Sequence, residues 1–288
     1  MMKLVNHYAP FDAALLSAFE LSIYSALAED VGAGDLTGLL VPEAEWVKAR
    51  VIVREQAVLC GANWFEEVML RCDSLMEIHW HYAEGDLMQA DSLVCEIHGP
   101  ARALLTAERS ALNFLQLLSG VATKTRRYVD LVKGCKAAIL DTRKTIPGLR
   151  LAQKYAVRVG GGQNQRLALY DGILIKENHI AAAGGITPAL QAARALEAGV
   201  TIQIEVESIA ELQEALAAGA ESILLDNFDL DMMRAAVQLS AGKAVLEASG
   251  GINDRTVRAI AETGVDRISI GSLTKDVAAI DFSLRVVD

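Results

Sequence analysis

The sequence has little of what builds disulfide frameworks, metal clusters or membrane spans. It contains 4 cysteines in 288 residues, and no two of them have the Cys-x-x-Cys spacing of a zinc or redox motif. Scattered cysteines of this kind are typical of reduced thiols in a cytosolic protein. No apolar run approaches the ~20 residues of a membrane span, and the N-terminal segment lacks the apolar stretch of a signal peptide. We therefore expect a cytoplasmic protein with no membrane partner.

Positive charge is also scarce. The chain has 27 Lys and Arg residues against 37 Asp and Glu residues, a net charge of −10. This balance argues against nucleic acid as a partner, because nucleic-acid affinity depends on cations that neutralise phosphates. The hydrophobic content of 52% allows a sizeable core, and the length suggests one large domain or two smaller ones.

The first third of the chain mixes helical and strand patterns. An apolar stripe over residues 11–28 predicts a helix, and a second helix is expected over 64–70. Apolar and alternating runs predict strands over 48–60, 77–82 and 92–98. This mixed order favours a separate α+β domain of about 110 residues.

Residues 103–132 have a helical pattern that we expect to break near Ser119 and Gly120. Arg109 lies inside this segment, directly after Glu108. The pattern alone leaves two interpretations of Arg109 open, a surface side chain that pairs locally and a functional one.

Beyond Gly134 the pattern becomes regular, with short apolar strands that end in polar residues and are followed by helices. The repeat is about 20 residues, one strand plus one helix, and such units build a parallel sheet or barrel. In a barrel of this kind the active site lies at the carboxyl ends of the strands. The barrel is expected to be incomplete, because six strands are evident. They cover residues 137–144, 172–179, 201–207, 222–227, 244–251 and 267–272.

Residues 141–179 form a cationic island in this acidic chain. Seven cationic side chains oppose three acidic ones here, so the segment has a net charge of +4. Arg150, Lys154 and Arg158 recur every four residues, which is the spacing of one exposed helix face. We predict that these three are surface charges.

The other four cations of the island lie where charge is costly unless it is paired. Arg143 and Lys144 closely follow one apolar run, and Lys176 directly follows another. Arg166 lies just beyond a triple glycine, where the backbone can approach a ligand closely. A small polyanionic ligand would explain all four, because Arg suits planar carboxylates and Lys acts as a point charge.

Two carboxylates lie on successive strands of the repeat. In the strand over 201–207, Glu205 lies on the polar face, which suits the ligand-facing interior of a barrel. Asp226 ends the next strand. Both are candidate ligands for Mg²⁺, which typically takes one or two carboxylates together with substrate phosphates. The alternative is that Glu205 pairs with Lys144 or Lys176, and both interpretations can hold at once.

Small residues follow the last two strands. Ser249, Gly250 and Gly251 end one, and Gly271 and Ser272 end the other. Small residues before a helix expose backbone N–H groups to a phosphate, and in barrels the loops after the last two strands often form that site. Plain tight turns are the alternative, and the occurrence in successive loops favours the phosphate site.

Several longer motifs span nearly the whole chain in a fixed order. They are AEDVGAGDLT, ALNFLQLLSGVAT, LDTRKTIPGLR, KYAVRVGGG, LIKENHI, LLDNF and EASGGI. Together they resemble quinolinate phosphoribosyltransferase, also called nicotinate-nucleotide pyrophosphorylase (carboxylating). The resemblance implies a pentosyltransferase that uses quinolinate and phosphoribosyl pyrophosphate. Its products would be nicotinate mononucleotide, CO₂ and pyrophosphate, in de novo NAD biosynthesis.

The resemblance also implies the architecture, an N-terminal α/β sandwich domain and an incomplete, seven-stranded α/β barrel of the type II phosphoribosyltransferase kind. We place the sandwich at residues 1–114 and the barrel at 115–275. The remainder, 276–288, is a C-terminal tail for which a return to the N-terminal domain is one option. A homodimer or higher homo-oligomer with shared active sites is implied as well.

Roles at the site are carried over from the matching motifs. Lys144, Glu205 and Asp226 would be catalytic, and the two carboxylates would hold Mg²⁺ bound with phosphoribosyl pyrophosphate. Arg109 would reach the site from the partner subunit. The quinolinate pocket would be lined by Thr142, Arg143, Lys144, Gln165, Arg166 and Lys176. The 5′-phosphate would be held by Ser249, Gly250, Gly251, Gly271 and Ser272.

One departure from the family lies at Gln165, where members usually carry His between Asn and Arg. Gln can donate a hydrogen bond to a carboxylate but cannot carry charge. The departure keeps open a paralogous pyrophosphorylase-like family, associated with molybdenum transport, that has a different substrate. A catalytically silent phosphoribosyl-binding protein is a second alternative, and the carboxylates and lysines at the strand ends argue against it.

Overall fold

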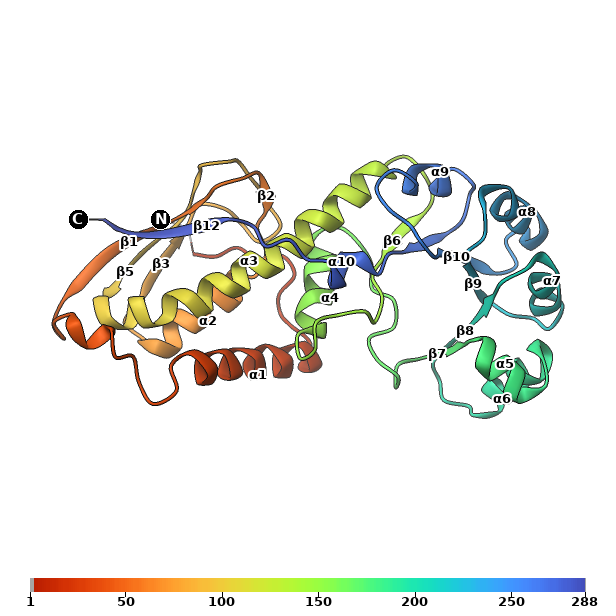
Figure 1. Ribbon diagram of the computed structural model, residues 1–288, viewed down its shortest axis with the longest axis horizontal. Coiled ribbons are helices and arrows are strands. Elements are labelled where there is room, and N and C mark those ends of the chain that lie inside the picture. The colour runs from red at the N-terminus through yellow and green to blue at the C-terminus, as the bar shows by residue number, and fades with distance from the viewer. Residues whose placement is uncertain (1–2, 288) are drawn as a thin grey trace. The chain divides into compact units, whose positions relative to one another are not determined.

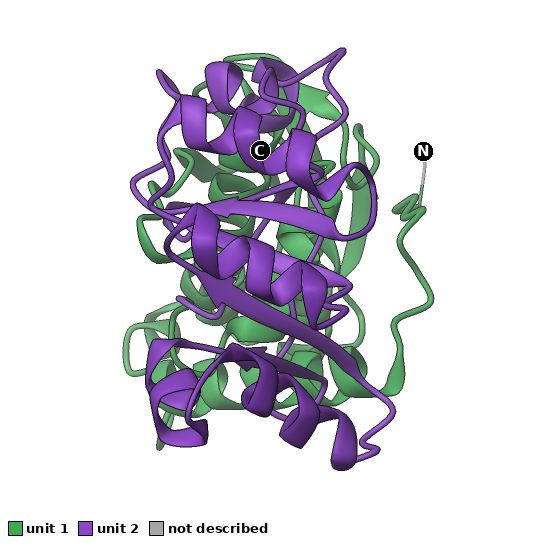
Figure 2. Ribbon diagram, turned by 90° about the vertical axis from the view of Figure 1, so that its right-hand side faces the viewer, with its two compact units in different colours: residues 1–126, 145–161, 274–288 green, residues 127–144, 162–273 purple. Residues whose placement is uncertain are grey.

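The computed structural model of the chain describes residues 3–287. Contacts divide the chain into two compact units, which Figure 2 shows in different colours. Unit 1 comprises residues 1–126, 145–161 and 274–288, and unit 2 comprises residues 127–144 and 162–273.

The chain passes from unit 1 to unit 2 inside one long helix, α3 (Ala101–Leu131). The domain limits predicted from the sequence, 1–114, 115–275 and 276–288, stay a prediction. Residues 1, 2 and 288 of those ranges lie outside the described part of the chain. Among residues 3–287, no helix has the length and apolar character needed to span a membrane.

Unit 1 is built on a four-stranded antiparallel sheet with the order β12-β1-β5-β3 (Figure 1). Ala49, Val51 and Val53 of β1 are fully buried, as expected for a strand with one face on a core. The run predicted as one strand over 48–60 is divided between β1 and β2. The strands are β1 (Trp46–Val53), β2 (Ala57–Val58), β3 (Glu77–Trp80), β4 (Leu87–Met88), β5 (Leu93–Pro100) and β12 (Phe282–Val287).

The helices of unit 1 share an apolar core with this sheet. Helix α1 begins after Asp12, whose carboxylate accepts a hydrogen bond from the Leu15 backbone N at 2.8 Å and caps the helix. Phe19 and Tyr155 pack on Trp64, with ring centroids 4.9 and 5.4 Å from its own. The helices are α1 (Ala13–Asp30), the 3₁₀ turn η1 (Gly38–Leu40), α2 (Ala62–Cys72), most of α3, and α4 (Arg150–Val159).

Helix α3 is continuous, so the predicted break near Ser119 and Gly120 is wrong. Both residues serve packing. The Ser119 hydroxyl accepts a hydrogen bond from the Cys60 backbone N and donates one to the Cys60 carbonyl, each at 3.0 Å. A Cβ at Gly120 would lie 2.2 Å from the Ala278 carbonyl oxygen, so glycine there permits a close approach of backbone.

Helix α4 corrects the prediction of an exposed charged face over Arg150, Lys154 and Arg158. Arg158 is exposed and Arg150 is partly buried, but Lys154 is only 1% exposed. Residues from Ala152 to Val157 are all buried, so most of the circumference of this helix is enclosed by its unit. A four-residue period of charge therefore did not mark a solvated face.

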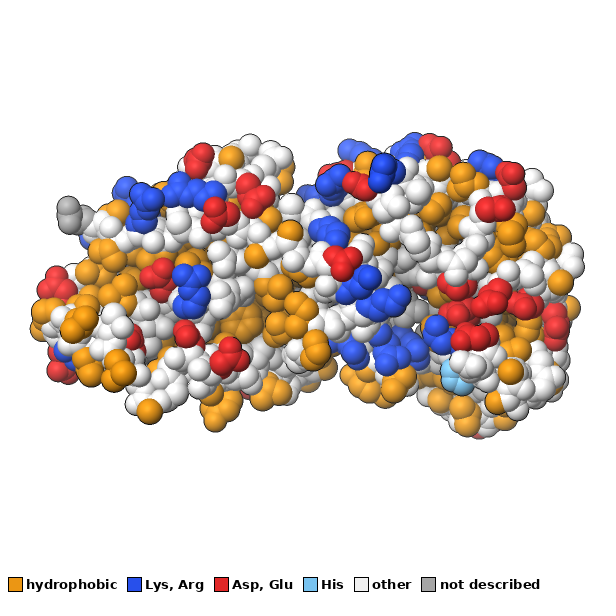
Figure 3. All heavy atoms as spheres, viewed as in Figure 1, with side chains coloured by type: hydrophobic (Ala, Val, Ile, Leu, Met, Phe, Trp, Pro, Cys, Tyr) orange, Lys and Arg blue, Asp and Glu red, His pale blue; other side chains and the backbone are white. Residues whose placement is uncertain are grey.

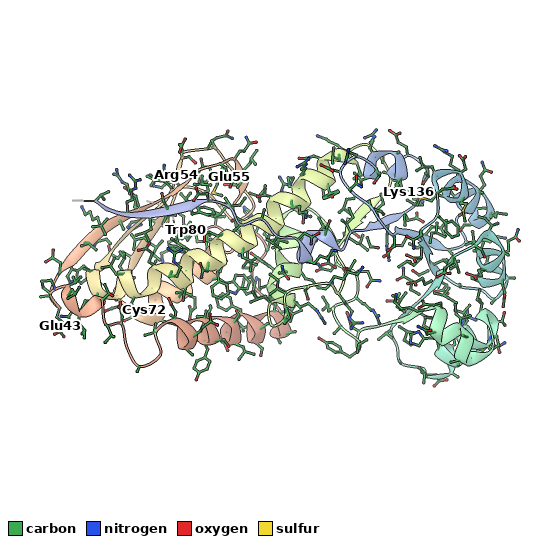
Figure 4. All side chains as sticks on the ribbon, in the orientation of Figure 1. Glu43, Arg54, Glu55, Cys72, Trp80 and Lys136 are labelled. Carbon is green, nitrogen blue, oxygen red and sulfur yellow. The ribbon has the colours of Figure 1, made fainter. Side chains whose placement is uncertain are left out.

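The last strand of the chain, β12, belongs to unit 1, where it pairs antiparallel with β1. Figure 4 labels Arg54 and Glu55, which follow β1 and lie beside the beginning of β12. The Arg54 backbone N donates to the Asp281 carbonyl at 2.8 Å, and the Asp281 N donates to the Glu55 carboxylate at 3.1 Å. These bonds secure the start of the edge strand.

Unit 2 is a six-stranded parallel sheet with the order β6-β11-β10-β9-β8-β7 (Figure 1). An isolated parallel bridge joins Leu140 of β6 to Gln163, so the segment at Gln163 stands where a seventh strand belongs. The sheet is not closed, and the prediction of an incomplete α/β barrel is confirmed. The strands are β6 (Ala138–Leu140), β7 (Gly172–Ile175), β8 (Thr201–Val206), β9 (Ser222–Asp226), β10 (Val245–Ser249) and β11 (Arg267–Ser269).

Helices follow the strands of unit 2 and bury their apolar residues against it. The predicted strand over 172–179 ends at Ile175, because Glu177–Ala183 form helix α5. The other helices are α6 (Ile186–Ala195), α7 (Ile209–Ala217), α8 (Leu230–Ser240), α9 (Val257–Ala261) and α10 (Ser272–Lys275).

Candidate active site

The carboxyl ends of the parallel strands carry nearly all of the predicted site residues of unit 2. Parallel strands bring these ends to one edge of the sheet, so residues far apart in sequence become neighbours. Figure 3 shows Asp and Glu side chains gathered over the region of β8 and β9, with Lys and Arg side chains beside them over the loops that precede β7. The predicted residues at these ends are Thr142, Arg143, Lys144, Lys176, Glu205, Asp226, Ser249, Gly250, Gly251, Gly271 and Ser272.

Asp141 organises the loop that carries Gln165. It is fully buried directly after β6. Its carboxylate accepts a hydrogen bond from Asn164 Nδ2 at 2.6 Å and another from the Gln165 backbone N at 2.9 Å. We had not predicted Asp141 as a site residue, although an acid at a strand end, two residues ahead of a pair of cations, was a signal for it.

Arg143 and Arg166 are close enough to repel each other. Burial and the neighbouring Arg143 lower the pKa of Arg166, and Asp171 acts against both. Arg166 Nη1 donates to the Gly172 carbonyl at 2.9 Å. The Nε of Arg143 is buried and has no hydrogen-bond partner within residues 3–287. A buried guanidinium donor without a partner, beside a second cation, is suited to an anionic ligand.

Glu205 and Lys176 form an ion pair at the ends of β8 and β7. Lys176 Nζ lies 3.0 Å from Glu205 Oε2, and the Glu205 side chain is 8% exposed against 46% for Lys176. Burial raises the pKa of Glu205, Lys176 opposes this, and the charges of Asp226 and Glu177 raise it further. The pairing with Lys176 that we gave as an alternative is therefore present, and it leaves Asp226 as a second carboxylate nearby.

Two glycine-bearing loops lie at the ends of β10 and β11. Gly250 has φ +103°, and a Cβ there would lie 2.2 Å from Asn227 Oδ1, so only glycine fits without displacing Asn227. A Cβ at Gly271 would lie 2.9 Å from Lys144 Cδ and 3.4 Å from Thr142 Oγ1. Glycine at 271 thus admits the Lys144 and Thr142 side chains to this loop.

Arg109 belongs to unit 1, where it lies exposed on α3. It borders a hollow of about 360 Å³ together with Asp35 and Thr106. The Asp35 carboxylate accepts from Thr106 Oγ1 at 2.8 Å and from the Gly38 N at 2.9 Å, and these bonds lower its pKa. Arg109 is therefore outside the group that unit 2 brings together.

Comparison with known proteins is decisive for the family. The model of the quinolinate phosphoribosyl transferase N-terminal domain matches residues 35–119, and that of its C-terminal domain matches residues 121–285. The chain belongs to the quinolinate phosphoribosyl transferase family. Both halves of the chain are covered, so the membership does not depend on the charged strand ends alone.

Curated relatives and solved structures agree with this membership. The chain is 42% identical over 259 residues to the probable nicotinate-nucleotide pyrophosphorylase (carboxylating) of Bacillus subtilis (strain 168), covering 90% of each. It is 40% identical over 273 residues to the corresponding protein of Mycobacterium leprae (strain TN), covering 91% of this chain and 95% of that one. The structure of the nicotinate-nucleotide pyrophosphorylase from Francisella tularensis matches with a TM-score of 0.92, 43% identity and full coverage of both chains.

In this member of the family, Gln165 lies over the interior of the sheet of unit 2. Its Nε2 donates to Gln203 Oε1 at 2.8 Å, and Gln203 Nε2 donates to Glu247 Oε2 at 2.9 Å. Neither residue was among the predicted site residues. The signal for Gln203 was its place beside Glu205 on the polar face of the strand over 201–207, and the signal for Glu247 was a charge inside an apolar strand.

Proposed function

We propose that the chain is an enzyme that transfers phosphoribosyl from phosphoribosyl pyrophosphate to quinolinate, with decarboxylation, in de novo NAD biosynthesis. The observation that carries the proposal is the pair Arg143 and Arg166. Their mutual repulsion and the buried Nε of Arg143 are suited to a ligand with more than one carboxylate. Quinolinate is a dicarboxylate, and the family of the chain is named for it.

In the proposed reaction the ring nitrogen of quinolinate attacks C1 of the ribose while pyrophosphate leaves with the bonding electrons. The carboxylate next to the ring nitrogen then leaves as CO₂, and a proton takes its place to give nicotinate mononucleotide. The positive charge that develops on the sugar resembles the oxocarbenium character of glycoside cleavage. Glu205, held by Lys176 at 3.0 Å, stabilises that charge electrostatically.

We assign the Mg²⁺ that accompanies phosphoribosyl pyrophosphate to Glu205 and Asp226. Among residues 3–287 there is no group of three or more His, Cys, Asp or Glu residues that could hold a metal ion. Two carboxylates fit an ion that takes further ligands from substrate phosphates. When bound, Mg²⁺ neutralises charge on the pyrophosphate group. Glu205 and Asp226 position it, and their mutual repulsion, which contributes to the raised pKa of Glu205, favours a cation between them.

The loops after β10 and β11 receive the 5′-phosphate in this proposal. Gly251 has φ +60°, and a Cβ there would meet nothing within 4 Å, so its backbone borders open space. Lys144 contacts Gly271 and supplies positive charge beside the second loop. The backbone N–H groups of the loops bind the phosphate oxygens. These loops comprise Ser249, Gly250, Gly251, Gly271 and Ser272.

The proposed assembly is a homodimer or a larger homo-oligomer in the cytoplasm, with active sites shared between subunits. Arg109 is the residue that completes the site of the partner subunit. Its exposure on α3, far in sequence from the strand ends of unit 2, supports this role, because it is available to a second copy.

The activity is tested by incubating the protein with quinolinate, phosphoribosyl pyrophosphate and Mg²⁺ and following nicotinate mononucleotide. We expect one CO₂ per nucleotide from quinolinate labelled in the carboxylate next to the ring nitrogen. The control for loss of a cation at Arg143 is Arg234→Ala, which removes an exposed cation of α8 whose partner is Asp231, three residues away. This control should form nucleotide as the wild type does. A folded protein that forms no nucleotide from quinolinate would overturn the proposal and favour a paralogous enzyme with another substrate.

A further inference from the structure

Three polar side chains cross the interior of unit 2 in a single hydrogen-bonded line. It runs from Gln165, on the loop after α4, to Gln203 on β8 and then to Glu247 on β10. Gln203 is 6% exposed and Glu247 is 1% exposed. The three residues also border one cavity of about 340 Å³. Their sequence separations are 38 and 44 residues, so packing alone brings them into line.

The direction of this line is set at its buried end. An amide donates from its nitrogen and accepts at its oxygen. Glu247 Oε2 accepts from the nitrogen of the Gln203 amide, which turns the Gln203 oxygen toward Gln165. That oxygen in turn requires the nitrogen of the Gln165 amide. Each amide is fixed in one of two possible orientations by its neighbour.

Gln165 is held at both ends as a result. Its backbone N donates to buried Asp141 at 2.9 Å, and its side-chain Nε2 donates to Gln203 at 2.8 Å. A side chain fixed in this way does not lose further rotamer freedom when a ligand binds beside it. The Gln165 amide is therefore fixed in one orientation.

We propose that Glu247 is a positioning residue for the quinolinate pocket, and that it acts through Gln203 to fix the orientation of the Gln165 amide. The inference rests on the proposed function, because it assigns Gln165 to that pocket. Glu247 itself does not touch the substrate. Burial raises the pKa of Glu247, and Gln203, the Ser269 hydroxyl and the charge of Arg267 act against this rise.

The test compares the kinetics of the wild-type enzyme with those of variants that break the hydrogen-bonded line at Glu247 or at Gln203. Glu247→Met and Gln203→Met replace the polar groups with unbranched apolar side chains of similar length. We expect each to raise the KM for quinolinate by about tenfold, with kcat and the KM for phosphoribosyl pyrophosphate within about twofold. Glu247→Gln should stay near wild type, because its amide oxygen can still accept from Gln203. The matched control is Ser222→Ala, which borders the same cavity outside the line.

A double-mutant cycle separates positioning from general damage to the interior. In a Gln165→Leu background, Glu247→Met and Gln203→Met should add nothing to the KM for quinolinate, because the group that they orient is gone. Equal effects in the two backgrounds would overturn the proposal, as would an unchanged KM in the folded single variants. A loss of the same size in Ser222→Ala would also overturn it.

A second measurement distinguishes failure of this inference from failure of the proposed function. If the wild type neither binds nor turns over quinolinate, the proposed function fails. The line is then tested by the side-chain amide signals of Gln165 in an NMR spectrum, assigned by their loss in Gln165→Leu. We expect these signals to shift in Glu247→Met and to stay in place in Ser222→Ala. Unshifted signals in Glu247→Met would refute the line.

Discussion

Glu84 in unit 1 and Glu247 in unit 2 are both buried carboxylates, 2% and 1% exposed, and burial raises the pKa of both. Their partners differ. Glu84 accepts from Gly61 N at 2.8 Å, from Ala62 N at 3.2 Å and from the Tyr155 hydroxyl at 2.9 Å. Glu247 accepts from Gln203, and its Oε1 has no hydrogen-bond partner within residues 3–287.

The difference separates a group that serves the fold from groups that we propose serve the site. Gly61 caps α2 without a side chain, and Glu84 supplies the missing acceptors from a distant segment. The three donors to Glu84 all belong to unit 1. In unit 2, incompletely partnered polar groups such as Glu247 Oε1 and Arg143 Nε lie beside the candidate site. The buried Ser283 hydroxyl of unit 1 also lacks a partner, but it is a neutral group. A charged group left without a partner costs more stability, so the retention of two beside the site points to a ligand or to a positioning role.

The largest effect is expected from Glu84→Ala. It leaves the backbone donors of Gly61 and Ala62 buried without an acceptor, which should lower the free energy of unfolding by about 3 kcal/mol. Urea unfolding followed by circular dichroism measures the change. The control is Glu67→Ala, which removes an exposed pair with Arg71 and should cost under about 0.5 kcal/mol. Similar losses of unfolding free energy in the two variants would mean that Glu84 has no special role in stabilising unit 1.

Arg143→Ala should weaken quinolinate binding and leave stability nearly unchanged, the reverse of the pattern expected for Glu84→Ala. Loss of a charge-assisted hydrogen bond to a quinolinate carboxylate should weaken binding by about 1.5–3 kcal/mol, roughly 10- to 150-fold in Kd. The melting temperature should change little or rise, because the repulsion with Arg166 is relieved. Calorimetric titration with quinolinate and a thermal melt provide the two values. An unchanged Kd for quinolinate would exclude Arg143 from the pocket.

Mixed dimers examine whether unit 1 contributes to catalysis as well as to stability. If Arg109 completes the site of the partner subunit, inactive Arg109→Ala and Lys144→Ala chains should complement each other. One of the two sites in a hybrid dimer carries both lesions and the other carries neither, so about half of wild-type activity should return. No recovery after demonstrated subunit exchange would place Arg109 outside the partner's site.

Gln165→His should have a small effect. Arg143, Arg166 and the other cations of the pocket disfavour a charged imidazole, and a neutral ring can donate a hydrogen bond much as the amide does. We expect kcat/KM for quinolinate to change by under about tenfold, or ~1.4 kcal/mol. Kinetics from about pH 6 to about pH 9 span the imidazole titration. A gain far above tenfold from a nearly inactive wild type would mean that the natural substrate is not quinolinate.

The smallest effect is expected from Glu177→Gln. Burial raises the pKa of Glu205, and the charge of Glu177 adds to that shift. In the proposed reaction catalysis requires ionised Glu205, so activity should fall as the pH drops through this raised pKa. Removing the charge of Glu177 lowers the pKa of Glu205 toward its usual value and should move the acid limb of the pH–rate profile to lower pH. Glu221→Gln, an exposed carboxylate at the opposite end of β9, is the control, and equal shifts would exclude a local cause.

The sequence by itself determined the order of the elements and the positions of the charges. Apolar runs followed by polar residues predicted the strands of unit 2, because a buried strand must be apolar along its length and its end is where polar side chains can begin. Arg143, Lys176 and Asp226 were found as candidates for that reason, and Glu205 because it lies on the polar face of the alternating strand over 201–207. Burial of β-strands and the meeting of parallel strand ends follow from local pattern and chain connectivity, which a sequence contains directly.

Tertiary packing decided which side chains are buried and which distant residues meet, because the pattern of a single segment does not contain that information. The four-residue spacing of Lys154 resembles that of a surface charge, yet α4 is enclosed on most sides and Lys154 is buried. Ser119 and Gly120 resemble a helix break, yet α3 continues because both residues fit against backbone from distant segments. The line from Gln165 to Glu247 joins residues 82 positions apart through Gln203. Such contacts depend on which surfaces meet after the elements have formed, and no period or composition of a single segment records that.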